Sequence, residues 1–128
     1  WFNDSKATNV GACIAAIEGL ADSGKIILIA GGVAKDQDFS ELTTVLNKSV
    51  VAVITLGQDA ALIADVVPKD VQTQSADSMQ DAVIKAKAIA EQGQNILLSP
   101  ACASFDMFSG YAERGDTFEA SVKECLND

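Results

Sequence analysis

Three short stretches of this sequence carry side chains that could hold an anion. NDSKATN contains Lys6 and directly precedes an apolar helical pattern, GGVAKDQD places Lys35 after paired glycines, and SPACAS ends in Ser104. Ammonium groups, hydroxyls and the free amides at a helix N-terminus are the protein groups that bind carboxylates and phosphates. The three stretches therefore predict a site for a small anionic ligand.

The polar cluster before the first helical pattern has a second interpretation as a helix cap. Asn3, Asp4 or Ser5 could accept hydrogen bonds from the first free amides of that helix. A lysine is a poor choice there, because a cation at a helix N-terminus opposes the macrodipole by about 0.3 to 1 kcal/mol. Lys6 favours a binding role, in which a bound anion satisfies both the ammonium and the amides.

The SPACAS stretch also has a second interpretation, since its small residues allow a strand and a helix to pack closely. Cys102 fits that packing role better than a nucleophilic one, because the chain offers no base partner such as histidine. Ser104 differs, because it follows a predicted strand and precedes an apolar helical run. Its hydroxyl and the amides after it are therefore expected to face an anion.

Strand and helix patterns alternate along the chain and must position these stretches. Helical spacing predicts helices over 10–20, 39–47, 58–67, 78–93 and from Ser104 onward, and apolar runs predict strands over 25–32, 50–57, 71–74 and 95–100. Alternation of this kind is typical of an α/β, Rossmann-like domain with a mostly parallel sheet and helices on both faces. We expect a single domain over residues 1–128, with its ligand beyond the carboxyl ends of the strands.

Composition and charge exclude several functions. The formal net charge of -9 argues against binding to nucleic acid or to an anionic membrane, because both need clustered Lys and Arg. The chain has no histidine, which rules out Ser-His triads and His-ligated metal sites. It also lacks a GxxxxGK[ST] loop, so it is not a complete P-loop ATPase.

The cysteines and the first residue bear on the origin of the chain. Three cysteines without CxxC spacing suit a reducing compartment, so we expect a cytoplasmic protein. No signal peptide is recognisable, and a chain that begins with Trp1 is expected to be part of a longer one.

Together, the stretches resemble a known family. NDSKATN, GG..K.QDF and SPACASFDMF..Y.ERG.TF closely resemble the C-terminal domain of Mur ligases, in the form found in members that add D-glutamate. The resemblance covers the whole chain. The DNPR motif that would mark members adding diaminopimelate is absent.

The resemblance implies an ATP-dependent amide ligase of peptidoglycan precursor synthesis in the bacterial cytoplasm. ATP would phosphorylate the carboxylate of UDP-N-acetylmuramoyl-L-alanine to an acyl phosphate, which the amine of D-glutamate attacks. ATP and Mg²⁺ would be bound mainly by a central domain outside this chain, in a monomeric three-domain enzyme. The isolated chain is expected to hold no cofactor or metal and to have no ligase or ATPase activity.

The resemblance also implies roles for individual residues in binding D-glutamate. Lys35 and Thr8 would hold its α-carboxylate. Ser104, the backbone of Phe105, and Tyr111 would frame its side-chain carboxylate.

Two further residues would lie on the catalytic side, and two positions call for comment. Lys6 would reach the reacting carboxylate and phosphate, and Asp4 the ATP ribose or the hinge on which the domain moves as a rigid body. Asp36 stands where relatives commonly have glycine, which puts a carboxylate beside Lys35. For Arg114, the only arginine, a structural role at a helix terminus is favoured over substrate contact.

Two other functions remain open on the sequence. One is a stand-alone α/β binding module for a small anionic metabolite, without chemistry of its own. The other is a structural α/β domain used for oligomerisation.

Overall fold

The computed structural model describes residues 1–104 and 107–126, and its centre is a five-stranded, fully parallel sheet. The order of the strands is β1-β5-β2-β3-β4. Their bounds are Phe2–Asn3 for β1, Ile26–Gly31 for β2, Val50–Leu56 for β3, Gln72–Ser75 for β4 and Asn95–Leu98 for β5. The predicted α/β, Rossmann-like fold class is confirmed.

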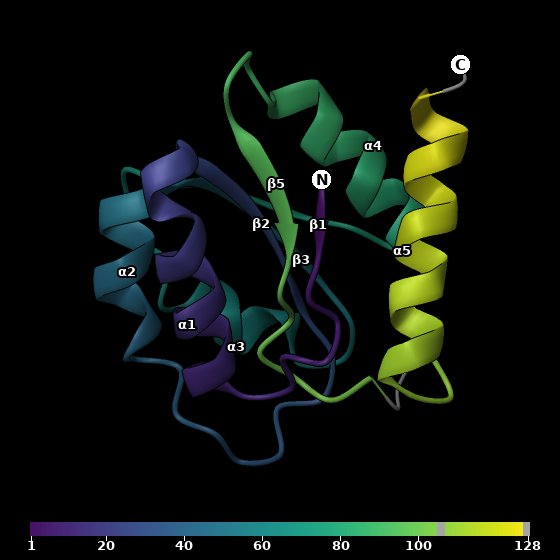
Figure 1. The fold of residues 1–128 in the computed structure, drawn as a ribbon. Helices are drawn as coiled ribbons and strands as arrows, with labels where there is room; N and C mark the ends of the chain where they lie inside the picture. The colour runs from purple at the N-terminus through teal and green to yellow at the C-terminus, as the bar shows by residue number, and fades with distance from the viewer. Residues whose placement is uncertain (105–106, 127–128) are drawn as a thin grey trace.

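Helices cover both faces of the sheet, as Figure 1 shows. The helices α1, α2 and α3 pack on one face, and α4 and α5 on the other. Their bounds are Val10–Leu20 for α1, Leu42–Ser49 for α2, Ala60–Ala64 for α3, Met79–Ile89 for α4 and Tyr111–Leu126 for α5, with a 3-10 turn at Ala21–Ser23. Each face buries its own hydrophobic cluster, so the domain folds around a core that it supplies itself.

The central strand β2 shows why its sequence is apolar at every position. Ile26 and Leu28 point into the cluster under α1 and α2, whereas Ile27 and Ile29 point into the cluster under α4 and α5. All four are fully buried. A strand covered on both faces needs apolar side chains in both directions, so it loses the usual alternation.

One strand was missed and several helix boundaries are wrong: α2 spans Leu42–Ser49 rather than 39–47, and α3 spans Ala60–Ala64 rather than 58–67. The strand β1 was not predicted, because two residues are too few to show a period; Phe2 and Asn3 pair with Leu97 and Leu98 of β5. The last helix begins at Tyr111 rather than after Ser104. The helix α4 ends at Ile89, where the backbone turns extended, rather than running to residue 93.

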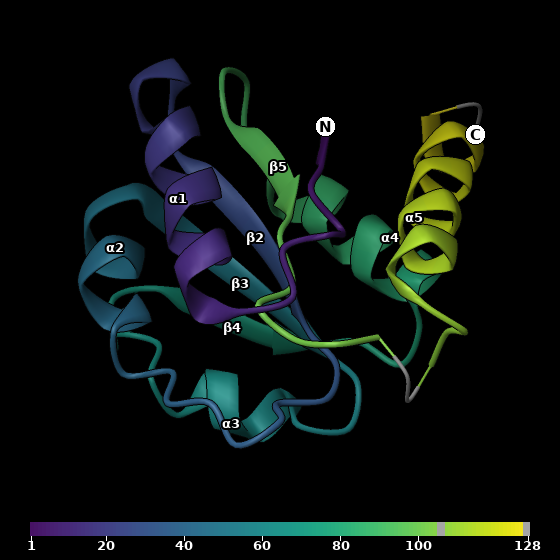
Figure 2. The same cartoon turned by 60° about the horizontal axis from the view of Figure 1, so that its bottom comes forward.

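The loops that leave β1, β2 and β5 meet at the carboxyl edge of the sheet. In Figure 2 the segments that follow β1 and β5 run beside each other below the strands. A hydrogen bond joins these two segments, from Ala101 N to Ala7 O at 2.9 Å. The loop after β2 is joined to the segment after β5, because Val33 and Ala103 exchange a pair of backbone hydrogen bonds at 2.8 and 3.0 Å. The fold therefore gathers at one place the three stretches that are predicted to bind an anion.

Within the described ranges, no helix is both long and apolar enough to span a bilayer.

Candidate functional site

A cavity of about 500 Å³ opens at this carboxyl edge. Four of the five residues predicted to bind D-glutamate line it, and they come from three separate loops and the start of α5: Thr8, Lys35, Ser104 and Tyr111. Ala103, Gly110 and Ala112 complete the lining. The fifth predicted residue, Phe105, lies outside the described residues.

Lys6 lines an adjacent cavity of about 330 Å³ rather than the first one. The two cavities share Tyr111 and Ala112 as a common wall. Asp4 lines neither; its backbone N–H donates to Leu98 O at 2.8 Å, directly after β1. The structure therefore places Lys6 beside the predicted amino-acid site and Asp4 further from it.

The first wall is the segment between β1 and α1, and it caps the helix with a residue other than the predicted Asn3, Asp4 or Ser5. The N-cap is Asn9, whose side chain accepts from Ala12 N at 2.9 Å. Lys6 thus lies three residues before the cap, where the macrodipole has largely decayed, so its position carries a smaller penalty than the sequence implied. Asn3 and Ser5, proposed as caps, contact other elements instead.

The second wall is the loop that carries Lys35. Lys35 and Asp36 are both left-handed, with φ of 52° and 62°, a conformation that is costly for residues other than glycine. Asp59 supports the loop, because its carboxylate accepts from Ala34 N at 2.7 Å. Asp36 is exposed, and it is not one of the described residues that line the cavity.

Glycine is required where this loop leaves β2. Gly31 and Gly32 have φ of 141° and 135°. A Cβ atom at Gly31 would collide with the carbonyl of Leu56, and one at Gly32 with the carbonyl of Ala103. Gly32 thus lets the Lys35 loop approach the Ser104 loop closely, and Gly31 lets the chain lie close to the end of β3.

The third wall contains Ser104, which is buried with 3% of its surface exposed. Its carbonyl accepts from Met107 N and Phe108 N, at 3.3 and 2.9 Å. The helix begins only at Tyr111, so the prediction that helical amides follow Ser104 directly is wrong.

Arg114 joins the first and third walls through hydrogen bonds. Its buried guanidinium donates to Ser5 Oγ at 3.0 Å, to Ser5 O at 2.6 Å and to Cys102 O at 2.9 Å. Ser5 Oγ in turn donates to Tyr111 O at 2.6 Å. These contacts fit the predicted structural role: Arg114 lies in the first turn of α5 and joins this helix to the segments that follow β1 and β5.

The two cysteines near the site are buried packing residues. Cys102 has no exposed surface, which fits the packing interpretation. Cys13 is also fully buried, and its thiol donates to Ser99 O at 3.1 Å. Burial raises the pKa of Cys13 to about 12, because the thiolate would lose its hydration.

Metal ligands do not gather in the part of the chain that is described. No group of three or more Asp, Glu or Cys residues lies together among residues 1–104 and 107–126.

Two named bacterial proteins are similar to this chain over nearly its whole length. A protein of Nitrosococcus oceani named UDP-N-acetylmuramoylalanine–D-glutamate ligase is 49% identical over 127 residues, which cover 99% of this chain and 28% of the relative. A protein of the same name from Colwellia psychrerythraea is 54% identical and covers 96% of this chain and 26% of the relative. The chain thus spans about a quarter of the length of these relatives.

A solved structure and a family model also match. A domain from Haemophilus ducreyi, described as part of a UDP-N-acetylmuramate:L-alanyl-γ-D-glutamyl-diaminopimelate ligase, superposes with a TM-score of 0.59 at 16% identity, covering 94% of this chain and 83% of that domain. At that identity the likeness shows the fold alone. The family model described as Mur ligase, glutamate ligase domain matches residues 1–102. The chain therefore belongs to the Mur ligase family, as its C-terminal, glutamate ligase domain.

Proposed function

We propose that this chain is the D-glutamate-binding domain of an ATP-dependent ligase that adds D-glutamate to UDP-N-acetylmuramoyl-L-alanine. The supporting observation is the convergence of Thr8, Lys35, Ser104 and Tyr111 on one cavity. The names of the relatives support the choice of substrates. The proposed setting is peptidoglycan precursor synthesis in the bacterial cytoplasm.

The cavity has the chemistry that a dicarboxylate requires. Lys35 supplies an ammonium group, Thr8 and Ser104 supply hydroxyls, and none of the described lining residues carries a carboxylate. Charge-assisted hydrogen bonds contribute about 1.5 to 3 kcal/mol each, so two or three of them would hold an amino acid within an acidic domain. Lys35 and Thr8 would bind the α-carboxylate, and Ser104 with Tyr111 the side-chain carboxylate.

Lys6 is assigned to the reacting end of the substrate, because its cavity adjoins the first across Tyr111. In the proposed reaction ATP transfers its terminal phosphoryl group to the alanine carboxylate. The amine of D-glutamate then attacks the acyl carbon and inorganic phosphate leaves. The ammonium of Lys6 would balance the negative charge that develops there.

The remaining parts of the reaction are assigned to the rest of the full-length protein. ATP and Mg²⁺ would bind mainly to a central domain, and Asp4, directly after β1, would lie on the ATP side or at the hinge. Residues 1–128 alone are then expected to show no ligase or ATPase activity.

A substitution in the full-length protein tests the proposal. We expect Lys35→Ala to raise the KM for D-glutamate by roughly ten- to a hundredfold, with the KM for ATP nearly unchanged. Thr43→Ala, on the distant helix α2, is the control and should leave both constants unchanged. Equal D-glutamate kinetics in the Lys35 variant and the wild type would refute the proposed site, and turnover by residues 1–128 alone would refute the proposed division of labour.

A further inference from the structure

The side-chain amide of Gln37 joins three segments at the carboxyl edge. Its Oε1 accepts from Val10 N at 2.8 Å. Its Nε2 donates to Ala34 O and to Ala101 O, both at 2.9 Å. One half-buried glutamine thus links the start of α1, the loop after β2 and the loop after β5.

Each of these three backbone groups lies within three residues of a side chain that lines the candidate cavity. The pairs are Val10 with Thr8, Ala34 with Lys35, and Ala101 with Ser104. Gln37 itself is not among the lining residues. It therefore contacts the frame of the site and not the space in which a ligand would lie.

The loop that Gln37 holds is one that would not keep its shape unaided. Lys35 and Asp36 are consecutive left-handed residues, and neither is glycine. Such conformations persist only where surrounding contacts enforce them. Gln37 follows them directly and bonds back to Ala34, so it closes the loop around the two strained residues.

We propose that Gln37 is a positioning residue for D-glutamate binding: it holds the Lys35 ammonium opposite Thr8 and Ser104. This inference rests on the proposed function. A glutamine is suited to the task because one planar group supplies both an acceptor for Val10 N and two donors for carbonyl oxygens. Glutamate would keep the acceptor but would place a carboxylate against two carbonyl oxygens.

The test uses steady-state kinetics of the full-length protein with Gln37→Leu and Gln37→Glu. We expect each to raise the KM for D-glutamate by roughly five- to twentyfold, with less than a twofold change in the KM for ATP, because a preorganised cation is lost from one subsite only. The matched control is Gln94→Leu. Gln94 is also half-buried and its Oε1 accepts a backbone bond, from Glu91 N at 3.0 Å, but it lies in the loop that precedes β5.

A double variant separates positioning from general support of the fold. If Gln37 acts through Lys35, adding Gln37→Leu to Lys35→Ala should change the KM for D-glutamate by less than about twofold. Full additivity of the two effects would overturn the positioning role, as would a Gln37→Leu variant with the wild-type KM. These results differ from a failure of the proposed function, in which Lys35→Ala itself would leave the KM unchanged.

Discussion

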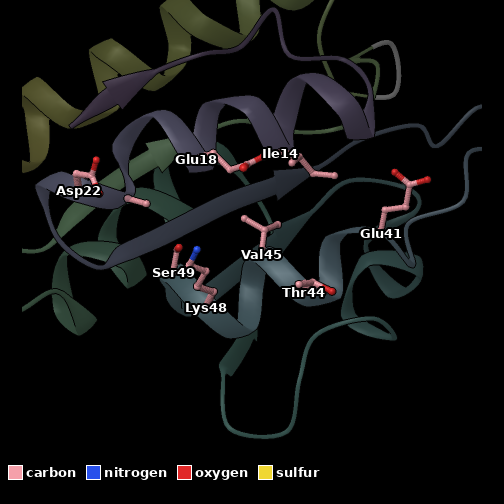
Figure 3. A pocket seen from close by; sticks show the side chains of 9 residues that line it. Ile14, Glu18, Asp22, Glu41, Thr44, Val45, Lys48 and Ser49 are labelled. Carbon is pink, nitrogen blue, oxygen red and sulfur yellow. The ribbon is translucent and has the colours of Figure 1, made fainter.

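Two cavities on this domain are built from the same three residue types, yet only one of them has the properties of a site. One is the cavity with Lys35 described above. The other, called here the second cavity, has a volume of about 360 Å³ and lies between α1 and α2, away from the cavity lined by Lys6 (Figure 3). Each cavity is lined by one lysine, one threonine and one serine: Lys35, Thr8 and Ser104 in the first, and Lys48, Thr44 and Ser49 in the second.

The surroundings of those side chains distinguish the two cavities. The cavity between α1 and α2 is also lined by Glu18, Asp22 and Glu41, which Figure 3 shows spread along it with Lys48. Three carboxylates repel an anion that one ammonium would attract. In the first cavity the polar residues come from separate loops, and none of its described lining residues is acidic. Convergence of loops and the sign of neighbouring charges therefore support the first cavity as the proposed site, which residue type alone does not.

The largest expected effect concerns the frame of the first cavity. Replacement of Arg114 by Leu would leave the carbonyls of Ser5 and Cys102 buried without their donor. Each unsatisfied group costs about 1 to 3 kcal/mol, so the free energy of unfolding of residues 1–128 should fall by roughly 3 to 5 kcal/mol. Urea unfolding measures this. Lys48→Leu, in the second cavity, is the control, and its free energy of unfolding should change by less than about 0.5 kcal/mol. An equally small loss in the Arg114 variant would show that the frame does not depend on Arg114.

Reversing the charge of each lysine tests the comparison directly. Lys35→Glu should raise the KM of the full-length protein for D-glutamate by about a hundredfold or more, because it places a carboxylate against a dicarboxylate. Lys48→Glu should leave that KM unchanged. Steady-state assays over a range of D-glutamate concentrations give both values. The comparison fails if the two variants behave alike.

The helix α1 contains the buried Cys13, whose ionisation makes the stability of the domain depend on pH. Burial raises the pKa of the Cys13 thiol from 9.0 to about 12. Below pH 9 the thiol is protonated in both states and stability is unaffected. Between pH 9 and 12 the unfolded state ionises first, so the free energy of unfolding falls by about 1.4 kcal/mol per pH unit from this group.

The measurement compares wild-type protein with Cys13→Ala by urea unfolding at pH 8.5 and 10.5. The wild type should lose roughly 2 kcal/mol more than the variant over this interval, because only the wild type has the buried thiol. Other groups titrate equally in both proteins and cancel. Parallel curves for the two proteins would contradict the assignment.

The smallest expected effect comes from replacing one buried serine in each cavity, Ser104 in the first and Ser49 in the cavity between α1 and α2. Ser104→Ala removes a hydroxyl of the protein that would bind D-glutamate, and it should raise the KM for D-glutamate by about tenfold. Ser49→Ala removes a hydroxyl that is buried to a similar degree, with 6% exposed against 3%, and should leave the KM unchanged. An unchanged KM in the Ser104 variant would remove that residue from the site while leaving the role of Lys35 intact.

Prediction from sequence succeeded where the pattern is local. Apolar runs located β2, β3 and β5 to within two residues, because a strand covered on both faces needs apolar side chains throughout. The cap of α4 was also recognisable: Ser78 accepts from Asp81 N at 3.0 Å, at the spacing that the sequence shows. Lys35 and Ser104 could be placed at the carboxyl edge because each follows a predicted strand.

The sequence by itself determined the α/β fold and the loops that meet at its carboxyl edge, since both follow from periodicity and from the rules of parallel sheets. Only the tertiary structure decided that β1 joins β5 and that Gln37 and Arg114 join loops at the carboxyl edge. The physical reason is distance along the chain. Gln37 bonds to a carbonyl 64 residues away and Arg114 to a serine 109 residues away, and no local pattern records such pairs.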